Sequence, residues 1–392
     1  MSQKNRILYV SATAGFFGGV ERYIYDTARL LAENGFEVSG LFERADGKEP
    51  DVFLEVFRKS YSPRDIEKFD GSEFDIAFIH KVEDPELLRK IRRKFTTIVF
   101  MHDHDYYCLR RHKYFPVTRI NCHLPFNPFY CSICCGLIER QKNCIKFINL
   151  FRRMALMREV RKCNAFAVIS GYMRNNLLIN GFDINSIYKL YPFKLLKDSV
   201  FRQKREDGPP VILYVGQFVR GKGVDLLLAA LAKLDIDFKA YIVGGNNDEG
   251  YLKEMSSGLG LDDKVIFTGW QSKPDEYFEK ADVVAFPSRW QEPFGLVGIE
   301  AFSFRKPVVG FDVGGVSEWL TDNHTGILVK EKDIDGLAEG LKRLLQDRTL
   351  ADKLGDNGYD FVRKHCSSEN FIAGFKVMIE DVLIMNKVKT HV

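Results

Sequence analysis

The sequence predicts an α/β protein with two doubly wound parallel sheets, one in each half of the chain. Short apolar runs alternate with longer amphipathic ones throughout, which is typical of parallel strands covered by helices on both faces. The length of 392 residues corresponds to two or three domains at about 150 residues each. A polar, charged and proline-marked stretch near 192–210 is typical of a linker between the halves.

The apolar runs are short and bounded by polar residues, as expected of buried strands. In the first half we expect strands at 7–10, 38–42, 76–79, 97–101 and 165–169, with helices at 20–34 and 85–94. In the second half we expect strands at 211–215, 239–243, 265–268, 283–286 and 307–311, with helices at 224–233, 248–257 and 296–304. A further helical pattern covers about 368–392.

Composition narrows the class of protein. Hydrophobic residues make up 45% and charged residues 28%, as in ordinary globular proteins, and a net charge of +4 does not favour nucleic-acid binding. We find no apolar signal segment near the first residues and no run of about 18 apolar residues. We therefore expect a cytoplasmic protein.

The loop after the first strand contains Gly15, Gly18 and Gly19 and opens a helix at Val20. Glycines let the backbone approach a phosphate, and a helix N-terminus offers N–H groups and a positive dipole end. The spacing is not the G-x-G-x-x-G of dinucleotide-binding proteins, although Glu43 after the second strand leaves a dehydrogenase as an alternative. A tight turn without a ligand is the other alternative.

Two carboxylates mark the second half. Glu292 lies in a loop after a strand, and Glu300 lies on the helix that this loop opens. The backbone amides of Phe294, Gly295 and Leu296 would be the N–H groups at the start of that helix. The alternative is a helix start with favourable acidic residues near its positive end.

The other strand ends in this half also carry glycines and cations. They contain Gly216, Gln217, Arg220, Gly221, Lys222, Gly223, Gly244 and Gly269. Because the carboxyl ends of parallel strands meet at one edge of a sheet, we expect a ligand site there.

This order of motifs resembles the retaining GT-B glycosyltransferases of family 4, the "group 1" glycosyltransferases. The resemblance implies two Rossmann-like domains that face each other across a cleft. Residues 1–195 would form the acceptor-side domain, with a Cys-rich insertion at about 103–145 and with the helix at about 368–392 packed back on it. Residues 196–367 would bind the nucleotide sugar, and the cell-surface polysaccharide or glycolipid pathways of the family supply the expected setting.

The resemblance also implies roles for individual residues. Gly18 and Gly19 match the family's glycine loop beside the donor diphosphate. Lys222 matches its phosphate-binding lysine, and Glu292 and Glu300 match its E-x7-E pair, the first by the donor sugar and the second at the ribose. His102, at the end of the strand at 97–101, matches a histidine near the donor sugar. We therefore expect Glu292, His102 and Lys222 to be catalytic, in a reaction that needs no metal, with the loops near Gly244 and Gly269 contacting the base.

One position departs from the family pattern. The family has Arg after the glycine that ends the first strand of this domain, and here that residue is Gln217, which brings no charge to a leaving phosphate. Arg220, three residues on, is our candidate replacement. A catalytically impaired GT-B module and a sugar-nucleotide epimerase stay open as alternatives.

Six of the eight cysteines lie between Cys108 and Cys144. Cys131 and Cys134 have a metal-knuckle spacing, and Cys108 and Cys122 would complete a four-thiolate site for structural zinc or an iron–sulfur cluster. The alternative is a set of reduced, partly buried thiols.

The segment 139–162 carries eight Lys/Arg and two Glu, interleaved with apolar residues. Interpreted as one basic amphipathic helix, it would lie on an anionic membrane surface, which would suit a lipid-linked or glycan acceptor at the inner face of the cytoplasmic membrane. The alternative is a surface helix with one solvated face.

Overall fold

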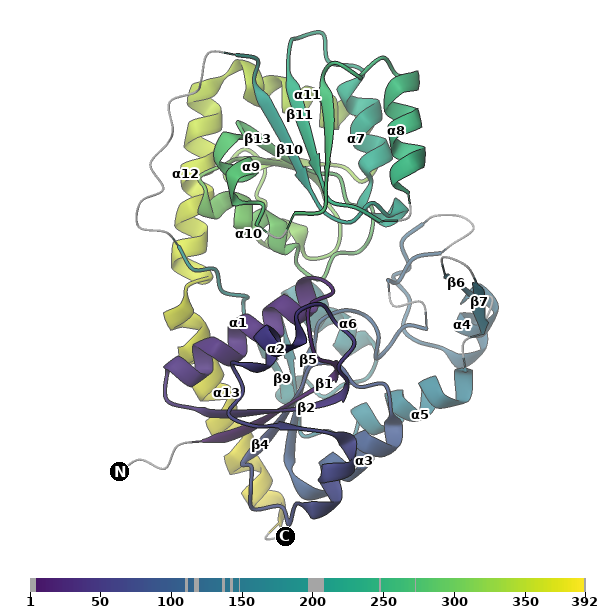
Figure 1. Cartoon of the computed structure of the whole chain (residues 1–392), viewed down its shortest axis with the longest axis vertical. Coiled ribbons are helices and arrows are strands. Elements are labelled where there is room, and N and C mark those ends of the chain that lie inside the picture. The colour runs from purple at the N-terminus through teal and green to yellow at the C-terminus, as the bar shows by residue number, and fades with distance from the viewer. Residues whose placement is uncertain are drawn as a thin grey trace. The chain divides into compact units, whose positions relative to one another are not determined.

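The computed structural model describes residues 5–109, 112–115, 120–135, 138–141, 144–147, 149–196, 208–246, 248–271 and 273–390. The chain divides into two compact units (Figure 1). Unit 1 comprises Met1–Tyr191 and Ser368–Val392, and unit 2 comprises Pro192–Ser367. Residues 197–207 of the expected linker lie outside the described residues.

Unit 1 contains a seven-stranded parallel sheet with the order β3-β2-β1-β4-β5-β8-β9. Its strands are β1 (Arg6–Thr13), β2 (Glu37–Arg44), β3 (Ser60–Tyr61), β4 (Ile76–Ile79), β5 (Thr96–Met101), β8 (Ala165–Val168) and β9 (Ile187–Lys189). The chain leaves β1 toward one edge and returns at β4 toward the other. The gap between β1 and β4 is therefore the topological switch point of this sheet.

Helices cover both faces of this sheet. The helices of unit 1 are α1 (Gly19–Glu33), α2 (Pro50–Leu54), η1 (Pro63–Lys68), α3 (Pro85–Lys94), α4 (Pro128–Cys135), α5 (Leu150–Val160), α6 (Gly171–Ile179), η2 (Ile184–Ser186) and α13 (Ser368–Thr390), and α4 lies beside β6 (Ile138–Gln141) and β7 (Cys144–Phe147) instead of on the sheet (Figure 1). Figure 1 shows α1 and α13 on one side of the sheet and α3 and α5 on the other.

The side-chain alternation of the strands explains this division. Tyr9, Phe78 and Phe100 stand on one face, where Phe78 meets Phe375 of α13 with ring centroids 5.3 Å apart. Their neighbours Val10 and Ile79 point to the opposite face and join the apolar cluster with α3 and α5. Successive residues of a strand face opposite sides of the sheet, so each strand that is buried on both faces is apolar along its length.

Unit 2 contains a six-stranded parallel sheet with the order β12-β11-β10-β13-β14-β15. Its strands are β10 (Val211–Val215), β11 (Lys239–Val243), β12 (Val265–Gly269), β13 (Val283–Phe286), β14 (Val308–Phe311) and β15 (Gly326–Val329). Its helices are η3 (Arg220–Lys222), α7 (Val224–Leu231), α8 (Glu249–Gly258), α9 (Asp275–Lys280), α10 (Leu296–Ser303), η4 (Val316–Glu318), α11 (Ile334–Gln346) and α12 (Arg348–His365). The predicted fold class, with two doubly wound parallel sheets, is confirmed.

The prediction of a single basic helix over 139–162 is wrong. Two antiparallel strands, β6 (Ile138–Gln141) and β7 (Cys144–Phe147), take the first part. The helix α5 begins only after Asn149, whose side chain accepts the N–H of Arg152 at 3.0 Å and caps the helix N-terminus.

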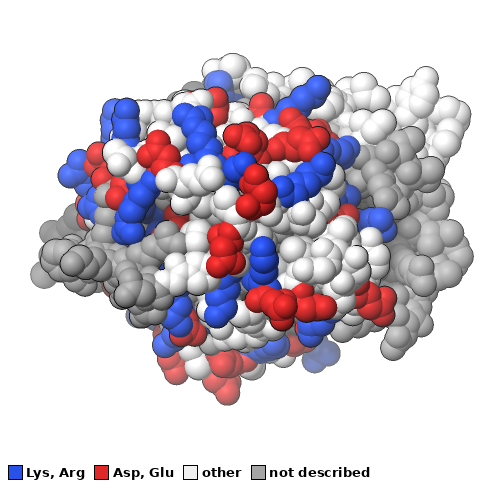
Figure 2. All heavy atoms as spheres, turned by 90° about the horizontal axis from the view of Figure 1, so that it is seen from above, with Lys and Arg blue, Asp and Glu red and all other residues white. Residues whose placement is uncertain are grey.

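Two properties of the described part of the chain bear on its surroundings. No helix there is both long and apolar enough to cross a bilayer. On the face seen in Figure 2, Lys and Arg side chains are interspersed with Asp and Glu. That face offers no broad cationic surface of the kind that binds nucleic acid.

Candidate active site

Two of the predicted site residues of unit 2, Lys222 and Glu292, meet at its switch point, between β10 and β13. Lys222 ends η3, which follows β10, and Glu292 lies in the loop after β13. The Nζ atom of Lys222 is 2.6 Å from Oε1 of Glu292, and Ser288 Oγ donates to the same oxygen at 2.5 Å. The Glu292 residue is only 6% exposed, so two donors fix its carboxylate where the sheet topology predicts a ligand site.

Glycines allow the two loops to approach this closely. Gly223 has φ +72°, and a Cβ there would lie 1.9 Å from the carbonyl oxygen of Pro287. A Cβ on Gly221 would lie 1.6 Å from the indole of Trp290. The backbone N–H of Arg289 donates to the carbonyl of Gly221 at 2.9 Å. The two glycines of the Gly-Lys-Gly sequence are therefore required for packing.

A buried ion pair holds the loop that follows β13, and sequence reasoning missed this pair. The guanidinium of Arg289 pairs with Asp225 of α7, and their side chains are 6% and 13% exposed. Arg289 and Asp225 are 64 residues apart, so no local pattern connects them. Proximity of Arg289 to the Glu292 motif was the one available signal.

The start of the helix after Glu292 is held by a residue far along the chain, Trp319. Gly295 has φ +98° and precedes α10 as its N-cap, so the first amides of α10 follow it directly. The carbonyl of Phe294 accepts a hydrogen bond from Nε1 of Trp319 at 2.5 Å. The indole of Trp319 also fills the space beside Gly298, where a Cβ would lie 2.2 Å from it. Trp319 therefore anchors both the loop and the helix.

Glu300 of α10 pairs with a lysine other than Lys222. Its carboxylate is 3.5 Å from Nζ of Lys194, and both side chains are 31% exposed. The predicted contact of Glu300 with a ribose stays a prediction.

The structure turns Arg220 toward α8 rather than toward Glu292. Its guanidinium lies 5.9 Å from the ring centroid of Tyr251. It lines a pocket of about 220 Å³ with Val219, Val224, Asp225, Asp248, Tyr251 and Leu252. Gln217 is exposed. Phosphate binding by either residue stays a prediction.

The three glycine loops on the other side of β10 contact one another. Gly244 has φ +148°, and a Cβ there would lie 1.8 Å from the carbonyl oxygen of Gly216. The N–H of Gly244 donates to the carbonyl of Gly269 at 3.0 Å. These loops form a continuous glycine-lined edge beside the Lys222–Glu292 pair.

In unit 1, the glycine loop after β1 packs against a second loop. Gly15 has φ +100°, and its Cβ would lie 2.7 Å from the backbone of Gly47. Gly18 precedes α1, and its N–H donates to the carboxylate of Glu21 at 2.9 Å. A phosphate at this amide would have to replace the Glu21 carboxylate, so the predicted diphosphate contact of Gly18 and Gly19 remains a prediction.

His102 follows β5 and is half-buried. Its Nε2 lies 2.9 Å from Nδ1 of His80, a residue that follows β4. Burial, together with His80 and Lys81, holds the pKa of His102 well below its ordinary value. His102 is therefore neutral at physiological pH, and sequence reasoning did not identify its partner.

A charged cluster lies beside these histidines. Nζ of Lys81 is 2.8 Å from Asp103 and 3.0 Å from Asp105. Burial raises the pKa of Asp103 to about 6, with Asp105 adding to the shift and Lys81 opposing it. Arg153 of α5 also reaches Asp105, at 3.4 Å.

The predicted metal centre at Cys108, Cys122, Cys131 and Cys134 is not supported. Across the described residues, no group of three or more His, Cys, Asp or Glu side chains is arranged to hold a metal ion. A buried cation stands among three of these thiols instead. Lys113 is 2% exposed and donates to Asn176 at 2.7 Å. Burial lowers its pKa, while Cys122, Cys108 and Cys131 act electrostatically to raise it.

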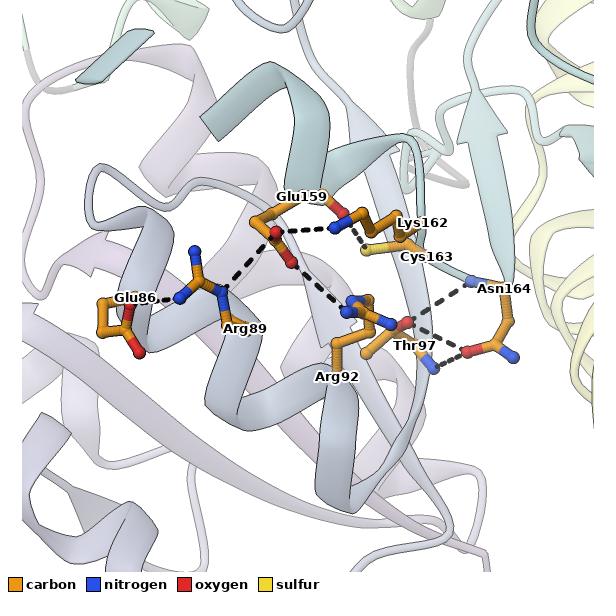
Figure 3. Close-up of polar contacts among 8 residues, drawn as sticks. All are labelled: Glu86, Arg89, Arg92, Thr97, Glu159, Lys162, Cys163 and Asn164. Atoms are coloured by element: carbon orange, nitrogen blue, oxygen red, sulfur yellow. Dashed lines mark hydrogen bonds and ion pairs between the residues drawn. The ribbon is translucent and has the colours of Figure 1, made fainter. Parts of the chain in front are cut away.

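Part of the basic segment is neutralised within unit 1. The carboxylate of Glu159 in α5 is 4% exposed and pairs with Lys162 at 3.0 Å. It also reaches Arg92 at 3.3 Å and Arg89 at 3.6 Å, both from α3 (Figure 3). These pairs hold α5 against α3.

Comparisons with known proteins agree with this fold. Residues 197–361 match the family model described as "Glycosyl transferases group 1". The N-acetyl-alpha-D-glucosaminyl L-malate synthase of Bacillus anthracis is 27% identical over 208 residues, which are 51% of this chain and 54% of that protein. The alpha-D-kanosaminyltransferase of Streptomyces kanamyceticus is 32% identical over 156 residues, which are 38% of this chain and 40% of that protein. The matches thus span about half the length of these curated relatives or less.

The likeness in fold extends over nearly the whole chain. A solved structure of Anabaena HepE in complex with UDP matches with a TM-score of 0.73 at 16% identity, covering 96% of this chain and 99% of that one. Fold and switch-point site together define a protein of the GT-B class. Residues 197–361 of the chain match the group 1 glycosyltransferases, family 4, and the resemblance inferred from the motifs is confirmed.

Proposed function

We propose that this chain transfers a sugar, with retention of anomeric configuration, from a nucleotide-diphosphate sugar to an acceptor hydroxyl. The observation that supports this most strongly is the buried Glu292 carboxylate, held by Lys222 and Ser288 at the unit 2 switch point. In this proposal residues 196–367 bind the donor and residues 1–195 provide the acceptor side. Because solved structures of Anabaena HepE are complexes with UDP and with UDP-glucose, UDP-sugars are the first donors to test.

Negative charge develops on the departing β-phosphate in this reaction, so the protein must supply positive charge there. Lys222 provides an ammonium group, and the amides that follow Gly295 provide N–H donors at the positive end of α10. Glu292 holds Lys222 in place before the donor arrives and orients the donor sugar afterwards. Cations and helix dipoles supply this stabilisation without a metal.

The test is a donor panel. Purified chain is incubated with UDP-, GDP- and ADP-sugars and the released nucleoside diphosphate is measured for wild type, Glu292→Gln and Lys222→Met. We expect release from one donor class, lowered about 100- to 1,000-fold in both variants. Lys233→Met is the matched control, because Lys233 is half exposed and pairs with Asp335 at the surface. Equal rates in all four proteins would contradict the assignment.

Two alternatives have distinct outcomes in the same panel. An epimerase would yield free epimer of the nucleotide sugar without an acceptor. An impaired GT-B module would give neither release nor a donor-dependent thermal shift. In that case Gln217→Arg would restore release if the missing cation is the cause. Where the wild type does release nucleoside diphosphate, loss of that release in Arg220→Met would identify Arg220 as the substitute.

We further propose that unit 1 contacts an anionic membrane surface peripherally, at the inner face of the cytoplasmic membrane. Helix α4 exposes Phe129, Tyr130 and Ile133 by 70%, 68% and 67%, and Phe151 at the start of α5 is 86% exposed. Exposed aromatic side chains beside a basic segment favour an interfacial location. Such a location would suit a lipid-linked acceptor in polysaccharide or glycolipid assembly.

Vesicle sedimentation tests this contact. We expect the chain to sediment with phosphatidylglycerol-containing vesicles and not with purely zwitterionic ones. Phe129→Ser with Phe151→Ser should reduce binding at least tenfold, since each exposed aromatic contributes buried apolar area. Tyr251→Ser, at a half-exposed position of unit 2, is the control. If the chain sediments equally with both vesicle types, or with neither, the membrane contact is contradicted. The basic segment would then be a surface segment whose charged face is solvated.

A further inference from the structure

The pairing of His80 with His102 carries an inference about the protonation of the site. His80 follows β4 and His102 follows β5, two adjacent strands of unit 1. The two rings share one hydrogen bond, between His80 Nδ1 and His102 Nε2 at 2.9 Å. Nδ1 of His102 has no bonded partner among the described residues and belongs to a half-buried ring, so it is the atom open to a ligand.

His80 is enclosed by aromatic rings. Its imidazole stacks on Tyr9, with centroids 4.6 Å apart, and on Phe100, 5.7 Å apart. Phe78 meets it edge to face at 4.6 Å. The residue is 1% exposed, and Nε2 is buried with no hydrogen-bond partner within the described residues. Burial lowers the pKa of His80 to about 3, so the ring carries one proton at neutral pH.

The position of that one proton decides the state of both rings. If His80 carries it on Nε2, a buried N–H has no acceptor. If His80 carries it on Nδ1, the N–H donates to His102 and only a bare nitrogen is left unpaired. Orphaned buried N–H groups are rarer than unpaired acceptors, so the second arrangement is favoured. His102 then accepts at Nε2, and as a neutral imidazole it carries its own proton on Nδ1.

We propose that His80 is a positioning residue that fixes His102 as the Nδ1–H tautomer, so that His102 presents a hydrogen-bond donor, not a base, to its ligand. The identification of that ligand as the donor sugar rests on the proposed function. A neutral N–H donor would hold a sugar hydroxyl or ring oxygen. It would not remove a proton from the acceptor, which therefore loses its proton to another group.

The tautomer can be measured in the ligand-free chain. Long-range ¹H–¹⁵N NMR of protein labelled with ¹⁵N-histidine distinguishes a protonated from a bare ring nitrogen, and the His102→Asn spectrum assigns the signals. We expect His102 to show a protonated Nδ1 and a bare Nε2 in the wild type. In His80→Phe we expect His102 to become a mixture of the Nδ1–H and Nε2–H tautomers. A wild-type His102 protonated on Nε2 would overturn the proposal.

A matched control and a rescue variant separate positioning from packing. His104 is also 1% exposed, but its Nδ1 pairs with Tyr107 at 2.7 Å. His104→Phe should leave the His102 tautomer unchanged. His80→Asn should restore the Nδ1–H form, since its amide N–H reaches nearly the place of the His80 Nδ1. If His104→Phe shifts the tautomer as much as His80→Phe does, the effect is one of packing and the proposal fails.

The activity readout follows the same logic. With the donor found in the panel, we expect His80→Phe to lower kcat about 10- to 100-fold with little change in KM, and His80→Asn to recover most of it. If His80→Phe changes the His102 tautomer but leaves kcat unchanged, the tautomer assignment stands and the proposed contact of His102 with the donor sugar is contradicted. Absence of any activity in the wild type would refute the proposed function while the NMR result still decides the tautomer.

Discussion

Replacing Trp319 by Phe tests whether a distant indole sets the position of the α10 start. Trp319 is fully buried, and its Nε1 donates to the carbonyl of Phe294 at 2.5 Å. Removing a donor from a buried acceptor costs about 1–3 kcal/mol. The smaller ring also leaves a void beside Gly298, which adds about 1 kcal/mol for each methylene-sized gap. We expect the free energy of unfolding of unit 2 to fall by about 2–4 kcal/mol.

Urea unfolding followed by tryptophan fluorescence measures this effect in unit 2 alone. All three tryptophans of the chain lie in that unit, so two remain as probes in each variant. Trp270→Phe is the matched control, because Trp270 is 62% exposed and surface changes usually stay within about 0.5 kcal/mol. If Trp319→Phe and Trp270→Phe destabilise unit 2 equally, the anchoring role of Trp319 is refuted.

Two further predictions concern other contacts. Lys81→Met removes the ammonium group from its two aspartate partners, Asp103 and Asp105. It should lower the unfolding free energy of unit 1 at pH 8 by about 3 kcal/mol, the lower limit for breaking a buried ion pair. Without Lys81 the pKa of the Asp103 carboxyl rises above its present value of about 6. A raised carboxyl pKa stabilises the fold as pH falls, so the loss of unfolding free energy in the variant should shrink toward pH 5. A loss of the same size at every pH in chemical denaturation would contradict this. Gly221→Ala forces a methyl group into the Trp290 ring and should destabilise unit 2 by about 1–3 kcal/mol, whereas Gly258→Ala, with open space around it, should be neutral or stabilising; equal effects in thermal unfolding would exclude the predicted clash.

The strands that the sequence predicted well are those buried on both faces. The expected strand at 211–215 coincides with β10, and the one at 283–286 with β13, because every residue of each is apolar. The edge strands β9 and β15 were missed, since β9 has only three residues and β15 includes a glycine. The hairpin β6–β7 was missed because its basic residues were interpreted as part of one helix over 139–162, and the strands have no regular alternation of apolar and polar residues.

The glycines and carboxylates of the candidate site lie at strand ends, so sequence motifs reveal them. The residues that hold them come from far along the chain. Trp319 supports a carbonyl 25 residues away, and His80 meets a ring 22 residues away. Such contacts depend on which strands are neighbours in the sheet. Strand order follows from three-dimensional packing and is not visible in local periodicity.

Because helix α13 belongs to unit 1, the two units become complete at different times during synthesis. Unit 2 is one continuous stretch of chain, so every contact within it is available once residue 367 has emerged from the ribosome. Unit 1 is complete only when residues 368–390 follow, because Phe375 covers Phe36 and Phe78 and Asn386 donates to Thr96 at 2.8 Å. Until then the part of the unit 1 sheet face that α13 covers, beside α1, stays exposed. The unit whose first strands are synthesised first is thus the one whose last covering helix is synthesised last.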